Sequence, residues 1–99
     1  MTINLSLTVN DAPIKTDHFV AGFIDCTVSG MMEALKGTGK IKNLSLIIEN
    51  DNVVVNLNGA PVPINVFTSR IIRNTTIGMV SDLKGVNGAV KKISIVINK

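Results

Sequence analysis

The chain of 99 residues carries a net charge of +3 and consists of 45% apolar and 17% charged residues, which excludes an intrinsically disordered protein. A single cysteine excludes an internal disulfide framework, and no run reaches the roughly 18 apolar residues that a membrane span needs. We therefore expect one domain over residues 1–99, located in the cytoplasm and without a membrane contact.

The first strand is expected over residues 3–9, where apolar and polar side chains alternate with the period of a half-buried strand. Pro13 then marks a loop, and Thr16 or Asp17 can cap a helix that ends near Lys36. On a helical wheel, Phe19 and Phe23 fall on the apolar arc that is expected to face the core.

Residues 44–48 and 53–57 predict the second and third strands, joined as a hairpin by the turn-forming residues 50–52. A loop over residues 58–63 leads to a second helix, with Asn65 as its N-cap, the apolar residues Phe67 and Ile71 on its core-facing arc, and Gly85 as its stop after Leu83. A last strand covers residues 93–97.

The two halves of the chain resemble each other in sequence. Residues 10–37 return 48 positions later as residues 58–85, with 11 identities in 28 positions. We interpret this as an internal repeat of two βαβ units, one over about residues 1–50 and the other over about residues 51–99.

Two βαβ units joined by a hairpin predict an α+β fold, a four-stranded antiparallel sheet with both helices on one face. This βαββαβ order resembles the ferredoxin-like fold, which implies the spatial strand order 4-1-3-2. The resemblance is one of topology and carries no function across.

Gly30 and Gly78 occupy matching places in the two predicted helices, on the arcs that are expected to be buried. A glycine inside a helix costs about 1 kcal/mol relative to alanine. We expect both glycines to permit close packing against the rest of the core, so that Gly30→Leu overpacks it.

His18 and Cys26 are the chain's classical reactive side chains, and the eight residues of helix between them are too many for a catalytic pair. One histidine and one cysteine also provide too few ligands for a metal ion. The glycines near Lys40 follow a helix instead of preceding one, so they do not form a phosphate-binding P-loop. We expect no catalytic residue, no metal and no cofactor, and a non-enzyme is favoured.

Each end of the expected sheet combines a helix N-terminus, a loop of small residues and lysines from the other half of the chain. Exposed backbone amides beside cations suit a small anionic ligand such as a phosphate or carboxylate. Ordinary loop and helix-end chemistry explains the same pattern. The candidate anion-binding residues are Asn10, Asp11, Ala12, Lys84, Lys91 and Lys92 at one end and Asn58, Gly59, Ala60, Lys36, Lys40 and Lys42 at the other.

The sheet face away from the helices lacks the aromatic side chains that stack RNA bases. Its apolar members Ile47, Val54 and Val96 make it a candidate protein interface, although an ordinary solvated face explains them equally well. On the helices, Met32 and Ile77 add apolar surface that indicates self-association.

The sequence favours a non-enzymatic interaction or ligand-binding module that forms a homo-oligomer, with a homodimer as the simplest case. A nucleic-acid-binding protein acting through phosphate contacts is an alternative; the basic second half permits it, but the lysines form no continuous track. A small enzyme or an anion-binding protein with sites at the two loop ends is the remaining alternative.

Overall fold

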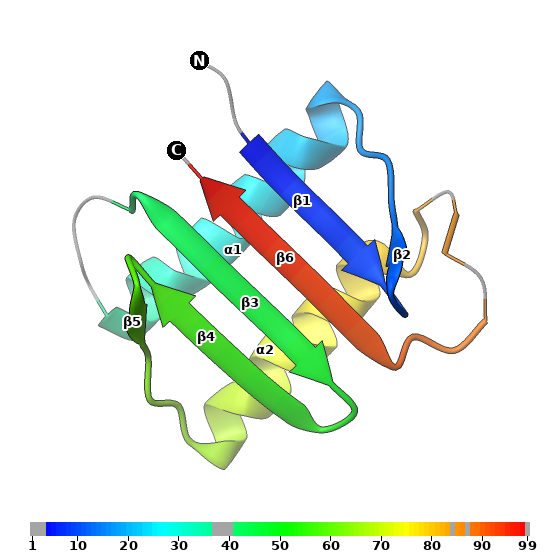
Figure 1. Ribbon diagram of the computed structural model, residues 1–99. Helices are drawn as coiled ribbons and strands as arrows, with labels where there is room; N and C mark the ends of the chain where they lie inside the picture. Colours follow the sequence, from blue (N-terminus) through cyan, green and yellow to red (C-terminus); the bar gives the residue numbers. More distant parts are fainter. Residues whose placement is uncertain (1–3, 37–40, 84, 87, 99) are drawn as a thin grey trace.

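The computed structural model describes residues 4–36, 41–83, 85–86 and 88–98. It has two layers, with two helices behind a single β-sheet (Figure 1). In chain order the elements are β1 (Asn4–Val9), β2 (Ala12–Pro13), α1 (His18–Lys36), β3 (Asn43–Glu49), β4 (Asn52–Leu57), β5 (Ala60–Pro61), α2 (Val66–Val80) and β6 (Lys92–Asn98). Among the described residues, no helix combines the length and the hydropathy needed to cross a membrane.

The sheet has six strands in the order β2-β1-β6-β3-β4-β5, and every pair of neighbouring strands in the described chain is antiparallel. The C-terminal strand β6 therefore lies near the centre, between β1 and β3. Its residue Ile95 lies opposite Leu7 of β1 on one side and Leu46 of β3 on the other.

The ferredoxin-like prediction is wrong. The sheet has six strands instead of four, and its long strands follow the order β1-β6-β3-β4, so that the first and third of them lie at the outside instead of the centre. The interpretation as two βαβ repeats is not supported either, because each half has an additional two-residue strand, β2 or β5, between its first long strand and its helix.

Two tight turns explain the strand order. Asn10 and Asp11 have φ angles of 52° and 65°, and Asn58 and Gly59 have φ angles of 52° and 82°. Positive φ at both central residues is the geometry of a type I′ hairpin. These turns fold β2 back onto β1 and β5 back onto β4, which occupies one edge of each long strand. Each of the strands β1 and β4 therefore has one free edge along which another long strand can pair. Neither can lie between two long strands, as the predicted order requires of both.

Both short strands contain a proline, Pro13 in β2 and Pro61 in β5. Proline lacks the N–H that an interior strand must donate, and it is tolerated at the edge of a sheet. In the sequence, the same prolines predict loops at these positions. They are edge strands of two residues each.

The core lies between the sheet and the helices and is aliphatic. Alternate residues of the four long strands point into it, and Ile93, Ile95 and Ile97 of the central strand β6 have no exposed surface. The twelve large side chains with almost no exposed surface are Ile24, Val28, Met32, Leu44, Leu46, Ile48, Val55, Ile72, Val80, Ile93, Ile95 and Ile97.

Helix α1 begins after Asp17, whose carboxylate accepts a hydrogen bond of 2.8 Å from the Val20 amide, as the sequence predicts for a cap. Asn65 caps α2 in the same way, with a bond of 2.8 Å from the Thr68 amide, which confirms the predicted N-cap. Helix α2 ends at Val80, earlier than predicted, where Ser81 is the C-cap and donates its backbone N–H to the Ile77 carbonyl.

The predicted rotation of both helices is wrong. Helix α1 buries Ile24, Val28 and Met32, whereas Phe19 and Phe23 remain 74% and 53% exposed. Asp25, a charged residue in the same helix, is only 8% exposed and accepts a hydrogen bond from the Ser29 hydroxyl. Helix α2 likewise buries Ile72, Thr76 and Val80 and exposes Phe67 and Ile71.

The two helix glycines do not support close packing. Gly30 and Gly78 are exposed, and a Cβ atom built at either position lies in open space. The expectation that Gly30→Leu overpacks the core is therefore wrong, because no core atom lies over this glycine.

Candidate functional site

The exposed surface of the two helices is unusually apolar. Phe19 and Phe23 of α1 and Phe67 and Ile71 of α2 are 74%, 53%, 71% and 46% exposed. In both helices the pair is spaced i and i+4, and the exposed glycine follows seven residues after the second member, so the three share one side of the helix. We define the helix-layer face as Phe19, Phe23, Cys26 and Gly30 of α1 together with Phe67, Ile71 and Gly78 of α2.

Helix α1 carries apolar or small side chains on its exposed side as well as on its buried side. Its exposed residues include Cys26, Gly30 and Ala34 beside the two phenylalanines, and Glu33 is the acidic one. A helix that is apolar all round is typical of an element covered on both sides. The exposed side of α2 is more polar, since it also carries Arg70 and Asn74.

A shallow groove of about 160 Å³ opens on this face where the beginning of α1 meets the end of α2. The rings of Phe19 and Phe23 form one wall, with their centroids 6.1 Å apart and their planes inclined by 41°. Met79 and Leu83 form the opposite wall. The lining is almost entirely apolar, so the groove suits an aromatic or aliphatic side chain and offers little to a polar ligand.

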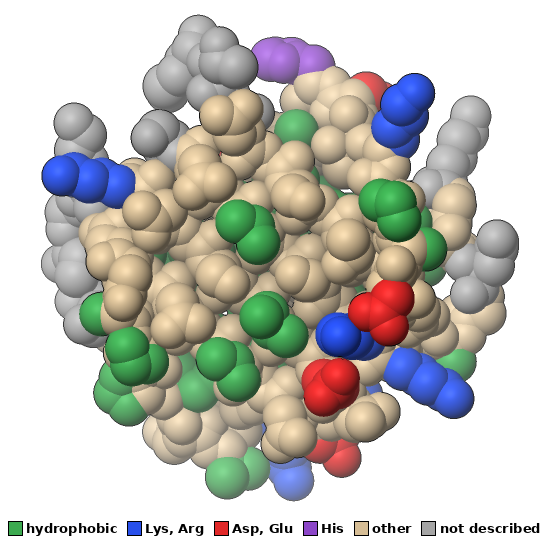
Figure 2. Space-filling view, in the orientation of Figure 1, with side chains coloured by type: hydrophobic (Ala, Val, Ile, Leu, Met, Phe, Trp, Pro, Cys, Tyr) green, Lys and Arg blue, Asp and Glu red, His purple; other side chains and the backbone are tan. Residues whose placement is uncertain are grey.

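The open face of the sheet presents the predicted residues Ile47, Val54 and Val96. Ile47 lies directly opposite Val54, and Val96 lies opposite Ser45, two residues away along β3, so the three form one small patch. Val54 is 50% exposed and the other two are half-buried. Figure 2 shows this face of the sheet, where a few apolar side chains lie among polar side chains and backbone, with basic and acidic groups near one border.

The helix residues predicted at an interface lie elsewhere. Met32 has no exposed surface and belongs to the core, so it is wrong as an interface residue. Ile77 is half-buried and packs against the core cluster. The sequence predicts excess apolar surface on α1 but assigns it to Met32, because the phenylalanines are expected inside, so the helix-layer face itself is not predicted. On the helical wheel of α1, apolar residues cover a wider arc than one buried face can accommodate, and this excess is the sequence signal for a second apolar surface.

The first predicted anion-binding end is internally satisfied. The Asn10 side chain accepts hydrogen bonds of 2.8 and 3.0 Å from the amides of Lys91 and Lys92 and donates one of 2.9 Å to the Ala89 carbonyl. The backbone amides of Lys91 and Lys92 therefore already have an acceptor. Ala12 is exposed in β2, and Lys84 lies outside the described residues.

The lysine at this end is also paired. The Lys92 ammonium lies 3.1 Å from a carboxylate oxygen of Asp11 and 3.8 Å from one of Glu49. The hydrogen bond to Asp11 and the negative charges of Asp11 and Glu49 raise the pKa of Lys92 above its ordinary value of 10.5. Two carboxylates around one cation disfavour an anionic ligand here.

The second predicted end has the same construction. The Asn58 side chain accepts bonds of 2.7 and 3.1 Å from the amides of Lys42 and Asn43. Gly59 and Ala60 form the turn and the start of β5. Lys40 and the side chain of Lys36 lie outside the described residues.

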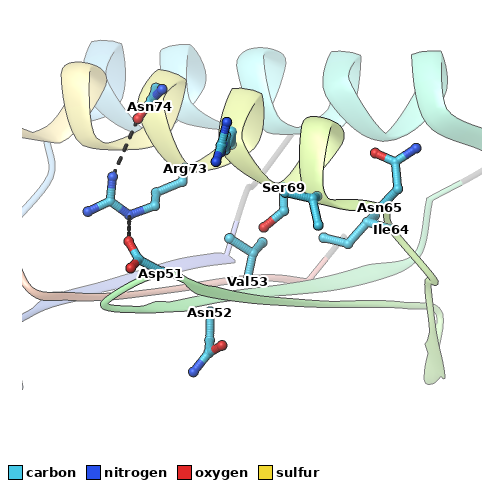
Figure 3. A pocket seen from close by; sticks show the side chains of 10 residues that line it. Asp51, Asn52, Val53, Ile64, Asn65, Ser69, Arg73 and Asn74 are labelled. Atoms are coloured by element: carbon cyan, nitrogen blue, oxygen red, sulfur yellow. Dashed lines mark hydrogen bonds and ion pairs between the residues drawn. The ribbon is translucent and has the colours of Figure 1, made fainter.

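A larger and more polar groove, of about 600 Å³, lies between α2 and the outer edge of β4 (Figure 3). Val53 and Ile64 line it together with Ser69, Arg70 and Arg73. The Arg73 guanidinium donates a bond of 2.7 Å to the Asn50 carbonyl and lies 3.7 Å from the Asp51 carboxylate. We call this the β4-edge groove.

The described residues offer no cluster of three or more histidine, cysteine or acidic side chains placed to hold a metal ion. His18 and Cys26 are both exposed. Neither a protein-family model, nor a curated protein, nor a solved structure matches this chain. The surfaces of the protein are therefore the basis for assigning a function to it.

Proposed function

We propose that the protein is a self-associating interaction module, in which two copies pack their helix-layer faces together. The observation that carries this proposal is the exposure of Phe19, Phe23, Phe67 and Ile71 on one side of a small domain. Single exposed apolar residues are normal on protein surfaces, but several large apolar side chains exposed on one face are typical of an interface.

The apolar area is sufficient for a dimer. The exposed fractions of Phe19, Phe23 and Phe67 correspond to about two whole phenylalanine side chains, or roughly 400 Å². A standard interface covers roughly 800 Å² on each partner, so the three rings alone supply about half of it. Burying them on both copies contributes on the order of 20 kcal/mol before the cost of association, which is about 4–15 kcal/mol.

The shape of the face also fits a second copy. Helices α1 and α2 run in opposite directions (Figure 1). Phe19 and Phe67 each lie in the first turn of their helix, so they belong to opposite ends of the helix layer. Gly30 and Gly78 leave open space on the same side of these helices. A two-fold axis through the layer allows rings of one copy to enter the groove or the space over the glycines of the other.

The helix-layer face is favoured over the open sheet face for this contact. The sheet patch has one strongly exposed apolar residue, Val54, and is surrounded by hydroxyl and amide side chains. The face also carries the ion pair of Lys92 with Glu49. Antiparallel sheets are stable with one face in water, so this surface needs no cover.

Sedimentation equilibrium across a range of protein concentrations tests the proposal. The wild type is expected to reach about twice its chain mass of 10.5 kDa, and Phe67→Ser and Phe19→Ser are expected to shift it towards the monomer. Val54→Ser, which removes a half-exposed apolar side chain from the sheet face, is the control and is expected to remain dimeric.

Three outcomes contradict the proposal. These are a monomeric wild type at every concentration, an association that the phenylalanine variants leave unchanged, and one that Val54→Ser alone abolishes. Circular dichroism checks that each variant is folded, which is expected because all three side chains are at least half exposed.

A further inference from the structure

The outer edge of β4 is only half covered. Strand β5 pairs with Asn56 and Leu57, and the last bond from the segment that follows it is 2.8 Å, from the Val62 amide to the Val55 carbonyl. Beyond this point the chain leaves the sheet to begin α2. The other half of the edge, Asn52–Val54, borders the β4-edge groove instead of a strand in the described chain.

The backbone of this half is oriented for pairing. In an antiparallel ladder, alternate residues direct their N–H and C=O groups to the same neighbour. Because the Val55 carbonyl points towards β5, Val53 presents its N–H and C=O on the same outer side, facing the groove. An uncovered row of such groups is a template for an added strand.

An added strand would contact helix α2 as well as the edge of β4. Figure 3 shows Val53 pointing from β4 towards α2, while Asn52 points to the opposite side of the sheet. Ser69 and Arg73 project from α2 above the strand, and Ile64 closes one end. A strand placed beside Val53 therefore has every second side chain under α2.

The charge of the groove selects among peptides. Arg70 and Arg73 line it against a single carboxylate, that of Asp51. Asp51 is 98% exposed and lies 3.7 Å from Arg73, a surface ion pair that contributes little and is readily exchanged. A carboxylate on an incoming strand can therefore contact both arginines.

We propose that the β4-edge groove binds an extended peptide segment of another protein, rich in acidic residues, which adds a strand beside Asn52–Val54. Backbone hydrogen bonds to Val53 provide the pairing, and acidic side chains under α2 meet Arg70 and Arg73. This goes beyond the proposed self-association, because it uses the sheet edge and not the helix-layer face.

A second copy of this chain is a poorer occupant than an acidic peptide. Pairing two β4 edges about a two-fold axis places both α2 helices on the same side of the joined sheet. Arg70 and Arg73 of each copy then approach those of the other, and like charges in a desolvated contact are unfavourable.

The test is an NMR titration of the full chain with ¹⁵N label, using the Phe67→Ser variant so that self-association plays no part. The probe is the N-acetylated, C-amidated peptide Glu-Val-Glu-Val-Glu. Saturable shifts are expected at the Val53 amide, which lies on the uncovered half of the edge, and at the Val55 amide next to it. The peptide Lys-Val-Lys-Val-Lys is expected to produce none of them.

Two variants of the experiment separate strand addition from simple charge attraction. Arg70→Gln is expected to weaken binding about fivefold, whereas Lys15→Gln, which removes one exposed charge far from the groove, leaves it unchanged. Methylating alternate backbone nitrogens of the acidic peptide is expected to abolish the Val53 shift, because the strand can no longer donate to the edge.

Several results overturn this proposal. These are an absence of shifts at Val53 and Val55, equal binding of the basic peptide, undiminished binding of the methylated peptide, or a Val53 shift that depends on protein concentration alone. The last result assigns the edge to a second copy. A monomeric wild type contradicts the proposed self-association and leaves the peptide titration unaffected, so the two failures are distinguishable.

Discussion

At the scale of single residues, Asn10 and Asn58 do the same two things. Each adopts a positive φ at the start of a type I′ turn, and each uses its side-chain oxygen to accept two amides where a neighbouring strand begins. Short Asx side chains are suited to both tasks. The Asn-x-Ala-Pro sequence therefore joins each hairpin to the sheet and is structural at these positions.

Asn10→Ala is expected to lower the free energy of unfolding by about 2 kcal/mol, because alanine disfavours positive φ and leaves two amides without their acceptor. Asn58→Ala is expected to cost a similar amount. Urea denaturation measures both, with Asn56→Ala on the open sheet face as the control. Equal stability of Asn10→Ala and Asn56→Ala contradicts the assigned role.

The Lys92 ion pairs give a pH dependence. Because its folded-state pKa is raised, the protonated lysine stabilises the folded chain from neutral pH up to about 10.5, and this contribution is lost as the pH rises through the folded-state pKa. The stability difference between wild type and Lys92→Met is therefore expected to be constant up to about pH 10 and to shrink above it. Urea denaturation between pH 8 and about 11 measures this difference, and one that grows with pH contradicts the assignment.

At the scale of elements, the sequence predicts the two helices, the four long strands and the hairpin between β3 and β4, because each depends on local periodicity and turn chemistry. It does not predict the rotation of the helices. Both Ile24 with Val28 and Phe19 with Phe23 form apolar stripes on α1, and a wheel cannot say which stripe meets the sheet. The choice depends on packing against strands that are distant in sequence.

The exposed glycines test that rotation. Gly30→Ala and Gly78→Ala are each expected to raise the free energy of unfolding by about 1 kcal/mol, since the added methyl group meets open space and alanine favours the helix. Thermal melting in the monomeric Phe67→Ser background measures this effect without a contribution from association. A lower melting temperature for Gly30→Ala shows instead that its Cβ meets core atoms.

At the scale of the whole molecule, the order of the strands lay beyond sequence reasoning. The prolines that follow Asn10-Asp11 and Asn58-Gly59 favour loops at these positions, although Asn-Gly is a strong hairpin signal and Asn and Asp both tolerate positive φ. Once β2 and β5 occupy the outer edges of β1 and β4, β6 takes the place between β1 and β3. The strand order therefore depends on pairing between residues far apart in the sequence, up to the 94 positions between Asn4 and Asn98.

The alternation of the sequence places Ile47, Val54 and Val96 on one face of the sheet, as the structure does, but an interface at these residues stays a prediction. The helix-layer face depends on the rotation of the helices, which the sequence leaves open. The β4-edge groove depends on how far β5 extends along β4, which no local pattern specifies. Surfaces made by tertiary packing are therefore the part that only the structure reveals.

The most direct test of self-association through the helix-layer face is the rate at which a maleimide labels Cys26, the single cysteine. Because Cys26 lies on this face, its labelling rate is expected to fall as the wild-type concentration rises, and to stay constant in Phe67→Ser. A cysteine on the open sheet face, Ser6→Cys with Cys26→Ser, is the control and is expected to react at a constant rate. A Cys26 rate that is independent of concentration while the mass doubles contradicts the proposed interface.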